Sequence, residues 1–352
     1  ANGVNVYQGV AGNPAEVVFE LTLDAMNNTY EFDLQKPLDH PDGNQQNEIV
    51  INLPVTATDN DGDTSPAFTL PIAVVDDVPI VINIESLRVD EDDLPLGSDG
   101  SKEPLTVSGE FEVTSADGID AFELDLSSNP IPNLKSGGEE VTLSQDVGAS
   151  TADALVYVGQ TPGVVTVFTL TLHQDGKYDF ELSGQLDHAV NSDEILLNLP
   201  VKITDGDNDT ITTTLPVTIV DDKPTIDAIS SGSTLSVDED DIPSQGSDDT
   251  PESNIIGGNF DVTDGADSIV SFQLDSLTSP VSGLTSGGQS LVMVEVSNAG
   301  GVSVYEARID GTTTPVFRMT LDASDDSYTF DLLAPLDHPN ADGQNELIIN
   351  LP

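Results

Sequence analysis

Clusters of aspartate on turn-forming segments are the residues of this sequence with the clearest chemical potential. Three carboxylates alternate in the segment ITDGDNDT at 203–210, and the pattern recurs in TDNDGDT at 58–64. An Asp-Asp pair occurs in VVDDVP and again in IVDDKP, and an acidic run occurs in VDEDDLP and again in VDEDDIP. The candidate metal ligands in these clusters are Asp59, Asp61, Asp63, Asp76, Asp77, Asp90, Glu91, Asp92, Asp205, Asp207, Asp209, Asp221, Asp222, Asp238, Glu239 and Asp240.

Binding of a hard divalent cation is the chemistry that such clusters favour. Ca²⁺ takes about 6–8 oxygen ligands in flexible geometry, and short carboxylates on turns can supply them. The chain has 63 acidic and 9 basic residues, for a formal net charge of -54. This charge argues against nucleic-acid or anionic-membrane partners, since both would repel it. We therefore expect Ca²⁺ as the bound ion.

The aspartate turns allow two other interpretations. An EF-hand loop is excluded, because Gly is not in the sixth place and the twelfth place holds Leu70 or Pro216 instead of Glu. An isolated Asp-Gly turn can also cap a hairpin without metal. The recurrence of three clusters in each repeat, with so few Lys or Arg to pair them, favours calcium. Carboxylates on both sides of a short linker would then clamp neighbouring repeats together.

A Leu-Asp-His motif occurs three times, at Asp39-His40, Asp187-His188 and Asp337-His338. In an enzyme, such a pair would be a general base with its orienting acid. In a structural corner, His would donate to a backbone carbonyl and Asp would cap a turn. The chain has no Cys, no G-x-S-x-G and no H-E-x-x-H. We predict a protein without catalytic residues, and the alternative is a hydrolase built on Asp187 and His188.

The segments that carry these residues repeat along the chain. Tyr30, Tyr178 and Tyr328 head three related segments that are 148 and 150 residues apart, and NEIVINLP, DEILLNLP and NELIINLP follow them. We predict that 1–79 is the C-terminal part of one repeat, that 80–224 is a complete repeat, and that 225–352 is a third repeat without its final strands. Because the pattern starts and stops within a repeat, we expect a fragment of a longer protein.

Within a repeat, nearly every apolar pattern is typical of β-strands. Residues 167–182 alternate apolar and polar side chains on both sides of an Asp175-Gly176 turn, which predicts a hairpin. Proline within the runs ILLNLPVKIT and TITTTLPVTIV indicates strand edges or bulges. The predicted fold is all-β: tandem antiparallel Greek-key, immunoglobulin-like β-sandwiches arranged end to end. A single short helix is possible in 119–128. No apolar run is long enough to insert into a membrane.

The ordered combination of these segments resembles the repeats of large type I-secreted RTX adhesins of Gram-negative bacteria. In order, they are Y-x-F-x-L, P-L-D-H, N-E-I-x-I-N-L-P-V, T-D-x-D-G-D-T, L-P-V-x-I-V-D-D-x-P and V-D-E-D-D-L-P. The resemblance covers essentially the whole chain. It departs from the family in lacking the G-G-x-G-x-D nonapeptides that such proteins carry nearer their C-terminus.

The resemblance implies a set of functional expectations. These are a bacterial cell-surface location, export by a type I system, calcium at domain boundaries that stiffens a stalk, and a part in cell adhesion and biofilm formation. Host or surface ligands would bind to other domains of the parent protein. We therefore expect a calcium-stabilised extender module. The alternative is a calcium-dependent glycan- or protein-binding module that uses the irregular stretches 96–104 and 244–256.

Overall fold

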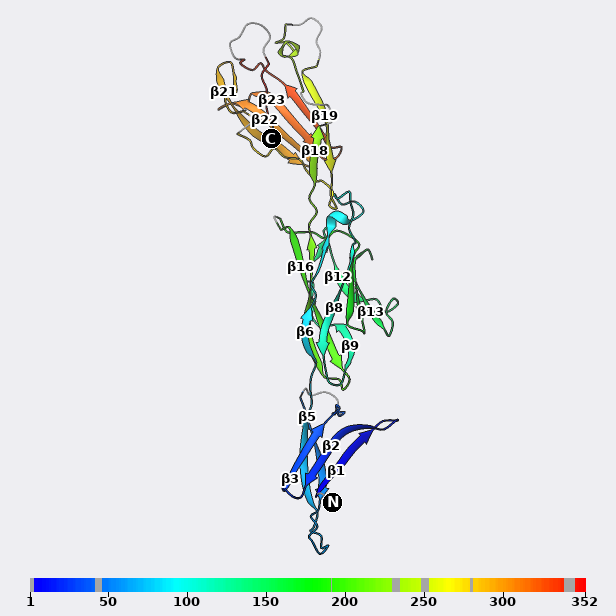
Figure 1. Ribbon diagram of the computed structural model, residues 1–352. Coiled ribbons are helices and arrows are strands. Elements are labelled where there is room, and N and C mark those ends of the chain that lie inside the picture. Colours follow the sequence, from blue (N-terminus) through cyan, green and yellow to red (C-terminus); the bar gives the residue numbers. More distant parts are fainter. Residues whose placement is uncertain are drawn as a thin grey trace. The chain divides into compact units, whose positions relative to one another are not determined.

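A computed structural model describes residues 3–41, 46–190, 192–229, 235–247, 253–278, 281–338 and 346–352. The chain divides into two compact units: unit 1 comprises 1–91 and 104–221, and unit 2 comprises 92–103 and 222–352. Both units consist of β-sheet (Figure 1). The helical elements among the described residues are two short 3₁₀ turns, η1 (Glu91–Asp93) and η2 (Glu239–Asp241). None of the described helices is long and apolar enough to cross a membrane. The all-β prediction is confirmed.

Unit 1 begins with strands that belong to the first predicted repeat. A three-stranded antiparallel sheet has the order β1-β2-β3, and a separate hairpin pairs β4 with β5. These strands are β1 (Val4–Ala11), β2 (Glu16–Asp24), β3 (Thr29–Leu34), β4 (Glu48–Val55) and β5 (Phe68–Val75).

The rest of unit 1 is built around two larger sheets. One has six strands in the order β12-β13-β14-β15-β8-β6, and the other has four in the order β7-β17-β16-β9. The first contains β6 (Ile80–Ile84), β8 (Thr106–Thr114), β12 (Thr142–Gln145), β13 (Ala154–Gln160), β14 (Thr166–His173) and β15 (Lys177–Leu182). The second contains β7 (Leu87–Asp90), β9 (Ile119–Leu124), β16 (Glu194–Asp205) and β17 (Thr210–Val220), and β10 (Lys135–Ser136) pairs with β11 (Glu139–Glu140).

The core of unit 1 forms from the inner faces of these two sheets. Every second side chain of β14 and β15 is fully buried, and so are alternate side chains of β16 and β17. The residues with 0 % exposure include Phe168, Leu170, Leu172, Tyr178, Phe180, Leu199, Ile203, Leu215 and Ile219. Period-two burial in two facing sheets is the pattern of a β-sandwich, as predicted.

The strand connections agree with most of the local predictions. β14 and β15 form the predicted hairpin, and Gly176 has a φ of 86° in its turn, a conformation that glycine adopts without steric cost. β16 pairs with β9 only from Val201 onward, and β17 pairs with β7 only from Val217 onward. Pro200 and Pro216 lie just before these stretches, so the N–H that each proline lacks is not missing from a part of the strand with neighbours on both sides.

The short helix considered for 119–128 is wrong. β9 occupies Ile119–Leu124 and pairs antiparallel with β16. Phe122 and Leu124 are buried. This two-residue spacing of large apolar side chains suits one face of a strand.

Unit 2 contains a seven-stranded curled sheet in the order β18-β19-β24-β23-β22-β21-β20 (Figure 1). Phe317, Tyr305 and Leu332 belong to its buried core. The strands are β18 (Thr225–Ile229), β19 (Ile255–Thr263), β20 (Thr285–Ser286), β21 (Gln289–Ala299), β22 (Val302–Ile309), β23 (Pro315–Asp322) and β24 (Ser327–Leu332). Residues 92–103 belong to this unit, although the sequence pattern assigns them to the second repeat.

Candidate metal centre

The turn between β16 and β17 holds the three alternating aspartates of the second repeat. The Asp205 N–H donates to the Asp209 carbonyl at 3.0 Å, and the Asp209 N–H donates to Asp205 Oδ1 at 2.8 Å. Asn208 has a φ of 71°, a left-handed conformation that Asn tolerates better than most residues. Both hydrogen bonds join Asp205 to Asp209 and hold the turn in place. The Asp207 carboxylate takes no part in them.

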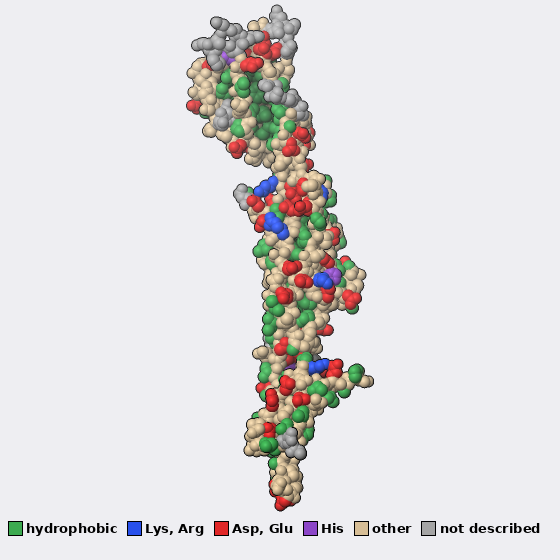
Figure 2. Space-filling view, in the orientation of Figure 1, with side chains coloured by type: hydrophobic (Ala, Val, Ile, Leu, Met, Phe, Trp, Pro, Cys, Tyr) green, Lys and Arg blue, Asp and Glu red, His purple; other side chains and the backbone are tan. Residues whose placement is uncertain are grey.

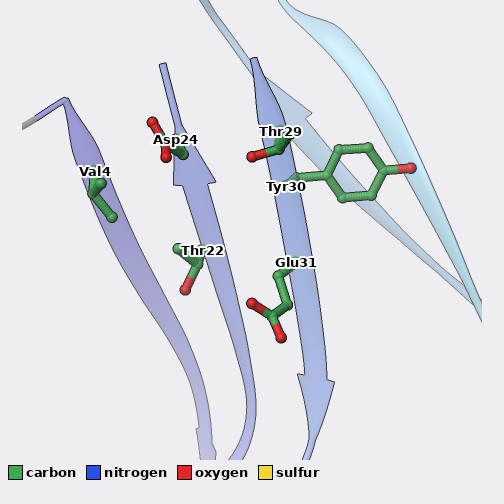
Figure 3. Close-up of a pocket in the computed structure, with 6 residues that line it drawn as sticks. All are labelled: Val4, Thr22, Asp24, Thr29, Tyr30 and Glu31. Atoms are coloured by element: carbon green, nitrogen blue, oxygen red, sulfur yellow. The ribbon is translucent and has the colours of Figure 1, made fainter. Parts of the chain in front are cut away.

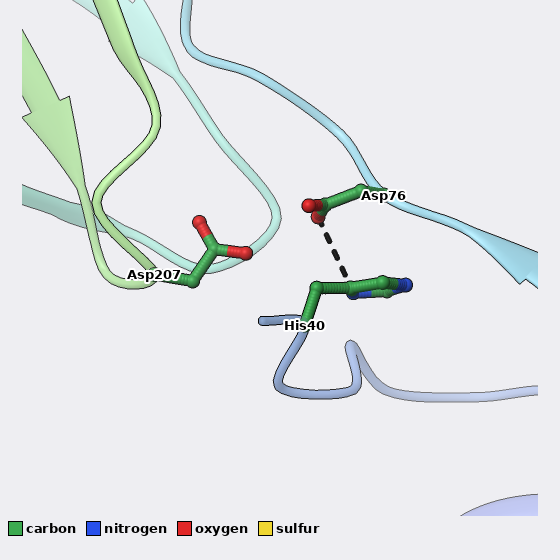
Figure 4. Close-up of side chains that lie close together, drawn as sticks. All are labelled: His40, Asp76 and Asp207. Carbon is green, nitrogen blue, oxygen red and sulfur yellow. Dashed lines mark ion pairs between the residues drawn. The ribbon is translucent and has the colours of Figure 1, made fainter. Parts of the chain in front are cut away.

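Two other segments of unit 1 bring carboxylates to this turn. Asp76 and Asp77 follow β5, and Asp117 lies in the turn between β8 and β9. One carboxylate oxygen from each of Asp76, Asp77 and Asp117 lies within 4.8 Å of the others. The same limit holds for the group His40, Asp76 and Asp207, in which Asp76 and Asp207 come from different segments and lie beside the imidazole (Figure 4).

Several of these carboxylates are almost completely removed from solvent. The exposed fraction is 4 % for Asp76, 1 % for Asp205, 7 % for Asp207 and 2 % for Asp209. Neither oxygen of Asp76 or Asp207 accepts a hydrogen bond from the described residues. Asp76 Oδ1 lies 3.3 Å from His40 Nδ1, which is an ion pair only when the imidazole is protonated. Such burial of carboxylates is costly unless a cation or hydrogen-bond donors compensate.

Mutual repulsion and burial raise the proton affinity of this group. Burial, followed by a hydrogen bond with Asp77, raises the pKa of Asp117 to about 6. Burial, followed by the close approach of the Asp207 carboxyl group, raises the pKa of Asp205 to about 6. The pKa of Asp76 is raised by burial first and then by the charge of Asp207, against the opposing influence of His40. In the metal-free protein, these acids therefore hold protons more tightly than exposed aspartates do.

The donor set fits a hard cation. The centre formed by Asp76, Asp77, Asp117, Asp205, Asp207 and Asp209, which we call the acidic centre, offers carboxylate oxygens from three separate segments. Oxygen ligands in flexible geometry are the preference of Ca²⁺, and the unbonded buried oxygens of Asp76 and Asp207 are in place to serve as ligands. His40 adds one nitrogen at the edge, which is not a typical calcium ligand.

The turn of the first repeat, at Asp59, Asp61 and Asp63, has the same backbone arrangement but a different environment. The Asp59 N–H donates to the Asp63 carbonyl at 3.0 Å, and the Asp63 N–H donates to Asp59 Oδ1 at 2.9 Å. One oxygen from each carboxylate lies within 4.8 Å of the other two, and all three residues are exposed. The structure thus brings these predicted ligands together, but not with Asp76 and Asp77.

A third group in unit 1 joins the acidic run to the Leu-Asp-His motif. Glu91 is fully buried and accepts a hydrogen bond from the Leu186 N–H at 2.7 Å. Its Oε2 lies 3.4 Å from His188 Nε2, and Asp221 places an oxygen within 4.8 Å of both.

Unit 2 contains part of the same arrangement. Glu239 Oε1 accepts a hydrogen bond from the Leu336 N–H at 2.5 Å and lies 3.3 Å from His338 Nε2. In both copies, the glutamate of the acidic run therefore accepts a hydrogen bond from the leucine N–H of the Leu-Asp-His motif and lies next to the histidine of that motif.

The aspartates of the Leu-Asp-His motif cap turns. Asp187 Oδ2 accepts a hydrogen bond from the Gly138 N–H at 2.8 Å. Asp337 accepts hydrogen bonds from the N–H groups of Gly287 and Gly288 at 3.0 and 2.7 Å. In the first copy, His40 Nδ1 lies 2.8 Å from the Leu38 carbonyl. These contacts match the structural-corner interpretation of the motif.

The remaining predicted ligands do not enter a group of three metal-binding side chains within the described residues. Asp222 is buried, and both of its oxygens accept hydrogen bonds, from Ser98 N–H at 2.9 Å, Ser98 Oγ at 2.5 Å and Ala266 N–H at 2.7 Å. Asp238 caps η2 by accepting a hydrogen bond from the Asp240 N–H at 3.2 Å. The other predicted ligands outside such groups are Asp90, Asp92, Asp205, Asp209, Glu239 and Asp240.

Sequence reasoning missed three residues of these groups: Asp117, His40 as a neighbour of Asp76, and His188 as a neighbour of Glu91. A signal for Asp117 existed, because GEFEVTSADG at 109–118 has a related copy at 258–267. A lone Asp beside Gly is so common in turns that it does not point to a metal. The histidine contacts join segments that are far apart in the chain, and no local pattern predicts them.

Comparisons with known proteins give limited matches. A family model described as "Domain of unknown function (DUF5801)" matches residues 1–69. No curated protein matches the sequence. Among solved structures, the extracellular cadherin domains 1–4 of Protocadherin Gamma B7 are similar at 11 % sequence identity, with 94 % of this chain and 83 % of that chain covered and a TM-score of 0.25. The family match is thus confined to the N-terminal part of the chain.

Proposed function

We propose that this chain is a calcium-stabilised structural extender module of a bacterial cell-surface RTX adhesin, and that it supports cell adhesion and biofilm formation. In this proposal the protein is exported by a type I system, works outside the cell and is not an enzyme. The order of the repeat motifs, the charge of -54 and the acidic centre support it. Ligands of the host or surface would bind to other domains of the parent protein.

The proposed mechanism is electrostatic. Asp76 and Asp77 lie at the end of the first predicted repeat, and Asp117, Asp205, Asp207 and Asp209 lie in the second. Calcium held by both sets would neutralise their charge and fix the two repeats of unit 1 to each other. Without it, repulsion among the carboxylates would loosen the link.

The observation that carries the proposal is the pair of buried carboxylates without hydrogen-bond donors, at Asp76 and Asp207. The acidic surface is also consistent with it. Figure 2 shows Asp and Glu side chains spread over the visible face, with few Lys or Arg among them. Glu91 with Asp221, and the exposed turn at Asp59, Asp61 and Asp63, are further candidate sites.

The alternative of a calcium-dependent ligand-binding module has weaker support. The first of its two irregular stretches is 96–104. In this stretch the Ser98 N–H donates a hydrogen bond to Asp222. The Lys102 ammonium group donates to the Asp92 and Gly97 carbonyls at 2.5 and 2.8 Å. These contacts favour a structural role for the stretch. Residues 248–252 of the second stretch lie outside the described residues.

Calorimetric titration of the chelator-treated chain with CaCl₂ tests the proposal. We expect saturable binding in the range of extracellular calcium modules, with Kd of about 10⁻⁴–10⁻³ M or tighter. Asp76→Asn should remove at least one site, whereas Asp33→Asn, a change on exposed β3, should leave the isotherm unchanged. No saturable binding to the wild-type chain, or identical isotherms for both variants and wild type, would refute the proposal.

A further inference from the structure

The histidine of the first Leu-Asp-His motif places a nitrogen beside the buried carboxylates of the acidic centre. His40 lies between β3 and β4, and its side chain is 3 % exposed. Its Nδ1 lies 2.8 Å from the Leu38 carbonyl and 3.3 Å from Asp76 Oδ1, and its Nε2 lies 3.3 Å from the Val74 carbonyl. These three neighbours are acceptors, so a neutral ring directs the lone pair of one nitrogen at an oxygen. A metal ion on that nitrogen, or a second proton, relieves this repulsion.

The spacing around Nδ1 is that of ligands around a small divalent ion. Ligands that are about 2.0–2.2 Å from Zn²⁺ and subtend angles of about 90–110° lie about 2.8–3.6 Å from one another. The distances from Nδ1 to the Leu38 carbonyl and to Asp76 Oδ1 fall in this range. The Nε2–H is then free to donate to the Val74 carbonyl, and a backbone carbonyl in that position orients a metal-binding imidazole.

Asp76 and Asp207 supply carboxylates to the same place. Figure 4 shows both side chains directed toward the space beside His40. One ligand atom from each of the three residues lies within 4.8 Å of the other two. The four carboxylate oxygens are buried and accept no hydrogen bond from the described residues. Because buried charge of this kind is costly without compensation, these oxygens are suited to a cation.

Asp76 belongs to two groups of potential ligands. One is the group with His40 and Asp207, which we call the histidine group, and the other is the oxygen-only group with Asp77 and Asp117. Oxygen ligands alone suit Ca²⁺, whereas an imidazole together with carboxylates suits Zn²⁺. Since Asp76 has two buried oxygens without donors, it can give one oxygen to each ion. The acidic centre therefore has room in its donor set for two ions of different chemistry.

The donor set of the histidine group recurs in unit 1. Glu91, His188 and Asp221 also place one nitrogen and two carboxylate oxygens within 4.8 Å of one another. His188 is the histidine of the second Leu-Asp-His motif, and Asp221 is the first aspartate of the second Asp-Asp pair, as Asp76 is of the first. The repeat thus brings its histidine to the same aspartate twice, which indicates a built feature of the repeat.

An acidic pocket elsewhere in unit 1 shows the contrasting case. Asp24 and Glu31 line a shallow pocket on the sheet of β2 and β3, and no histidine lines it (Figure 3). Both Asp24 oxygens accept hydrogen bonds, Oδ1 from the Met26 N–H at 2.8 Å and Oδ2 from Asn27 Nδ2 at 2.7 Å. These donors already compensate the Asp24 charge, so the pocket does not call for a cation.

We propose that the histidine group binds Zn²⁺, or a related divalent ion that favours imidazole, beside a calcium ion in the oxygen-only group. This inference rests on the acidic centre of the proposed function and adds a second ion to it. His40 Nδ1 and one oxygen each of Asp76 and Asp207 are the side-chain ligands, and the Leu38 carbonyl completes a four-coordinate set. The imidazole makes this position selective for zinc over calcium.

Calorimetric titration of the full chain with ZnCl₂, in saturating CaCl₂ at pH 7.5, tests the inference. We expect zinc binding that persists in calcium. His40→Gln should bind one equivalent of zinc at least about tenfold more weakly, since even the loss of a group that only orients a ligand costs about 10–100-fold in affinity. The calcium isotherm of this variant should match that of the wild type.

His173→Gln is the matched control. His173 is a more exposed histidine of unit 1 that lies 2.9 Å from the Asp179 carboxylate, and it belongs to no group of three metal-binding side chains among the described residues. This variant should keep the zinc equivalent that His40→Gln loses.

NMR of the histidine ring nitrogens in the wild-type chain does not depend on the folding of a variant. With calcium present, ZnCl₂ should shift the His40 Nδ1 resonance and leave Nε2 protonated. MgCl₂ at the same concentration should leave both resonances unchanged, because Mg²⁺ favours oxygen ligands.

Three results would overturn the inference. The first is an absence of zinc binding in saturating calcium; if calcium still binds, the proposed function stands and only the second ion is lost. The second is equal zinc binding by the wild type and His40→Gln, which would indicate adventitious zinc elsewhere on the chain. The third is a His40 ring with both nitrogens protonated and unchanged by zinc, which would show that a proton takes the place of the metal. Zinc binding at His40 without any calcium binding would instead refute the calcium proposal alone.

Discussion

Asp207 shows how a buried charge distinguishes two turns with the same backbone. The turn at 205–209 and the turn at 59–63 share their internal hydrogen bonds. Asp207 is 7 % exposed next to Asp76, whereas its counterpart Asp61 is exposed. Because the two aspartates differ mainly in environment, they form a matched pair for mutation.

Asp207→Asn should have opposite effects with and without calcium. In chelator, the change removes a buried charge without hydrogen-bond donors, so the free energy of unfolding should rise. In calcium at a hundredfold excess over Kd, the variant should lose about 2.7 kcal/mol of linkage stabilisation if its site is abolished. Denaturant unfolding in both conditions measures this. Asp61→Asn, the control, should change stability little in chelator, and equal behaviour of the two variants would contradict the assignment.

The raised pKa values of Asp117 and Asp205, about 6 against an ordinary 3.8, predict the pH dependence of the metal-free protein. Between pH 3.8 and about pH 6, the folded state binds more protons than the unfolded chain does. Stability should therefore be greatest below about pH 4, fall as the pH rises to 6, and level off above it. Urea unfolding across this range in EGTA tests the sign. Stability of Asp205→Asn should depend less on pH, and a stability that rises from pH 4 to 6 through these groups would be inconsistent with the burial described.

At the scale of elements, the Tyr-x-Phe-x-Leu strand illustrates how much a neighbouring strand contributes. In β15, Tyr178 is fully buried, and its hydroxyl donates to the Glu85 carbonyl and to the Glu110 carbonyl, the latter at 3.3 Å. The same tyrosine in β3 is 59 % exposed. The two strands have similar sequences, so the difference in exposure between the two tyrosines comes from β8 and β6, which lie next to Tyr178.

Tyr178→Ala should destabilise unit 1 by about 3–5 kcal/mol, because it opens a large cavity and removes the hydroxyl that donates to the Glu85 carbonyl. Tyr30→Ala should cost less than about 1 kcal/mol, since the ring is largely in solvent. Chemical denaturation of both variants in the same buffer provides the comparison. Similar losses for the two would mean that the burial of Tyr178 contributes little.

Local patterns predicted the strands well and the acidic centre only in part. Alternation along 167–182 and the Asp175-Gly176 turn identified the β14–β15 hairpin, because period two in a strand is a local property. The meeting of Asp76, Asp117 and Asp207 depends on the approach of three loops that are distant in sequence, which no local pattern encodes. The error at 119–128 arose because a short apolar run lacks a decisive period until its pairing with β16 is known.

At the scale of the whole molecule, the charge of -54 should make the metal-free protein sensitive to salt. Repulsion among like charges disfavours the compact state and is screened by ions. Raising NaCl from about 0.01 M to about 1 M shortens the screening length from about 30 Å to about 3 Å. In EGTA, the melting temperature should rise across this series, and in saturating calcium the rise should be smaller. An equal rise in both conditions would show that bound calcium does not relieve the repulsion.

Thermal unfolding of the wild-type chain with saturating CaCl₂ and with EGTA, at equal ionic strength and pH 7.5, tests the central claim most directly. If calcium fills the acidic centre, binding to the folded state alone raises the melting temperature, by several degrees for each site occupied at about a hundredfold excess over Kd. MgCl₂ at the same concentration should give a smaller increase, because Mg²⁺ demands stricter geometry and loses its water reluctantly. Identical transitions in CaCl₂ and EGTA would contradict the account.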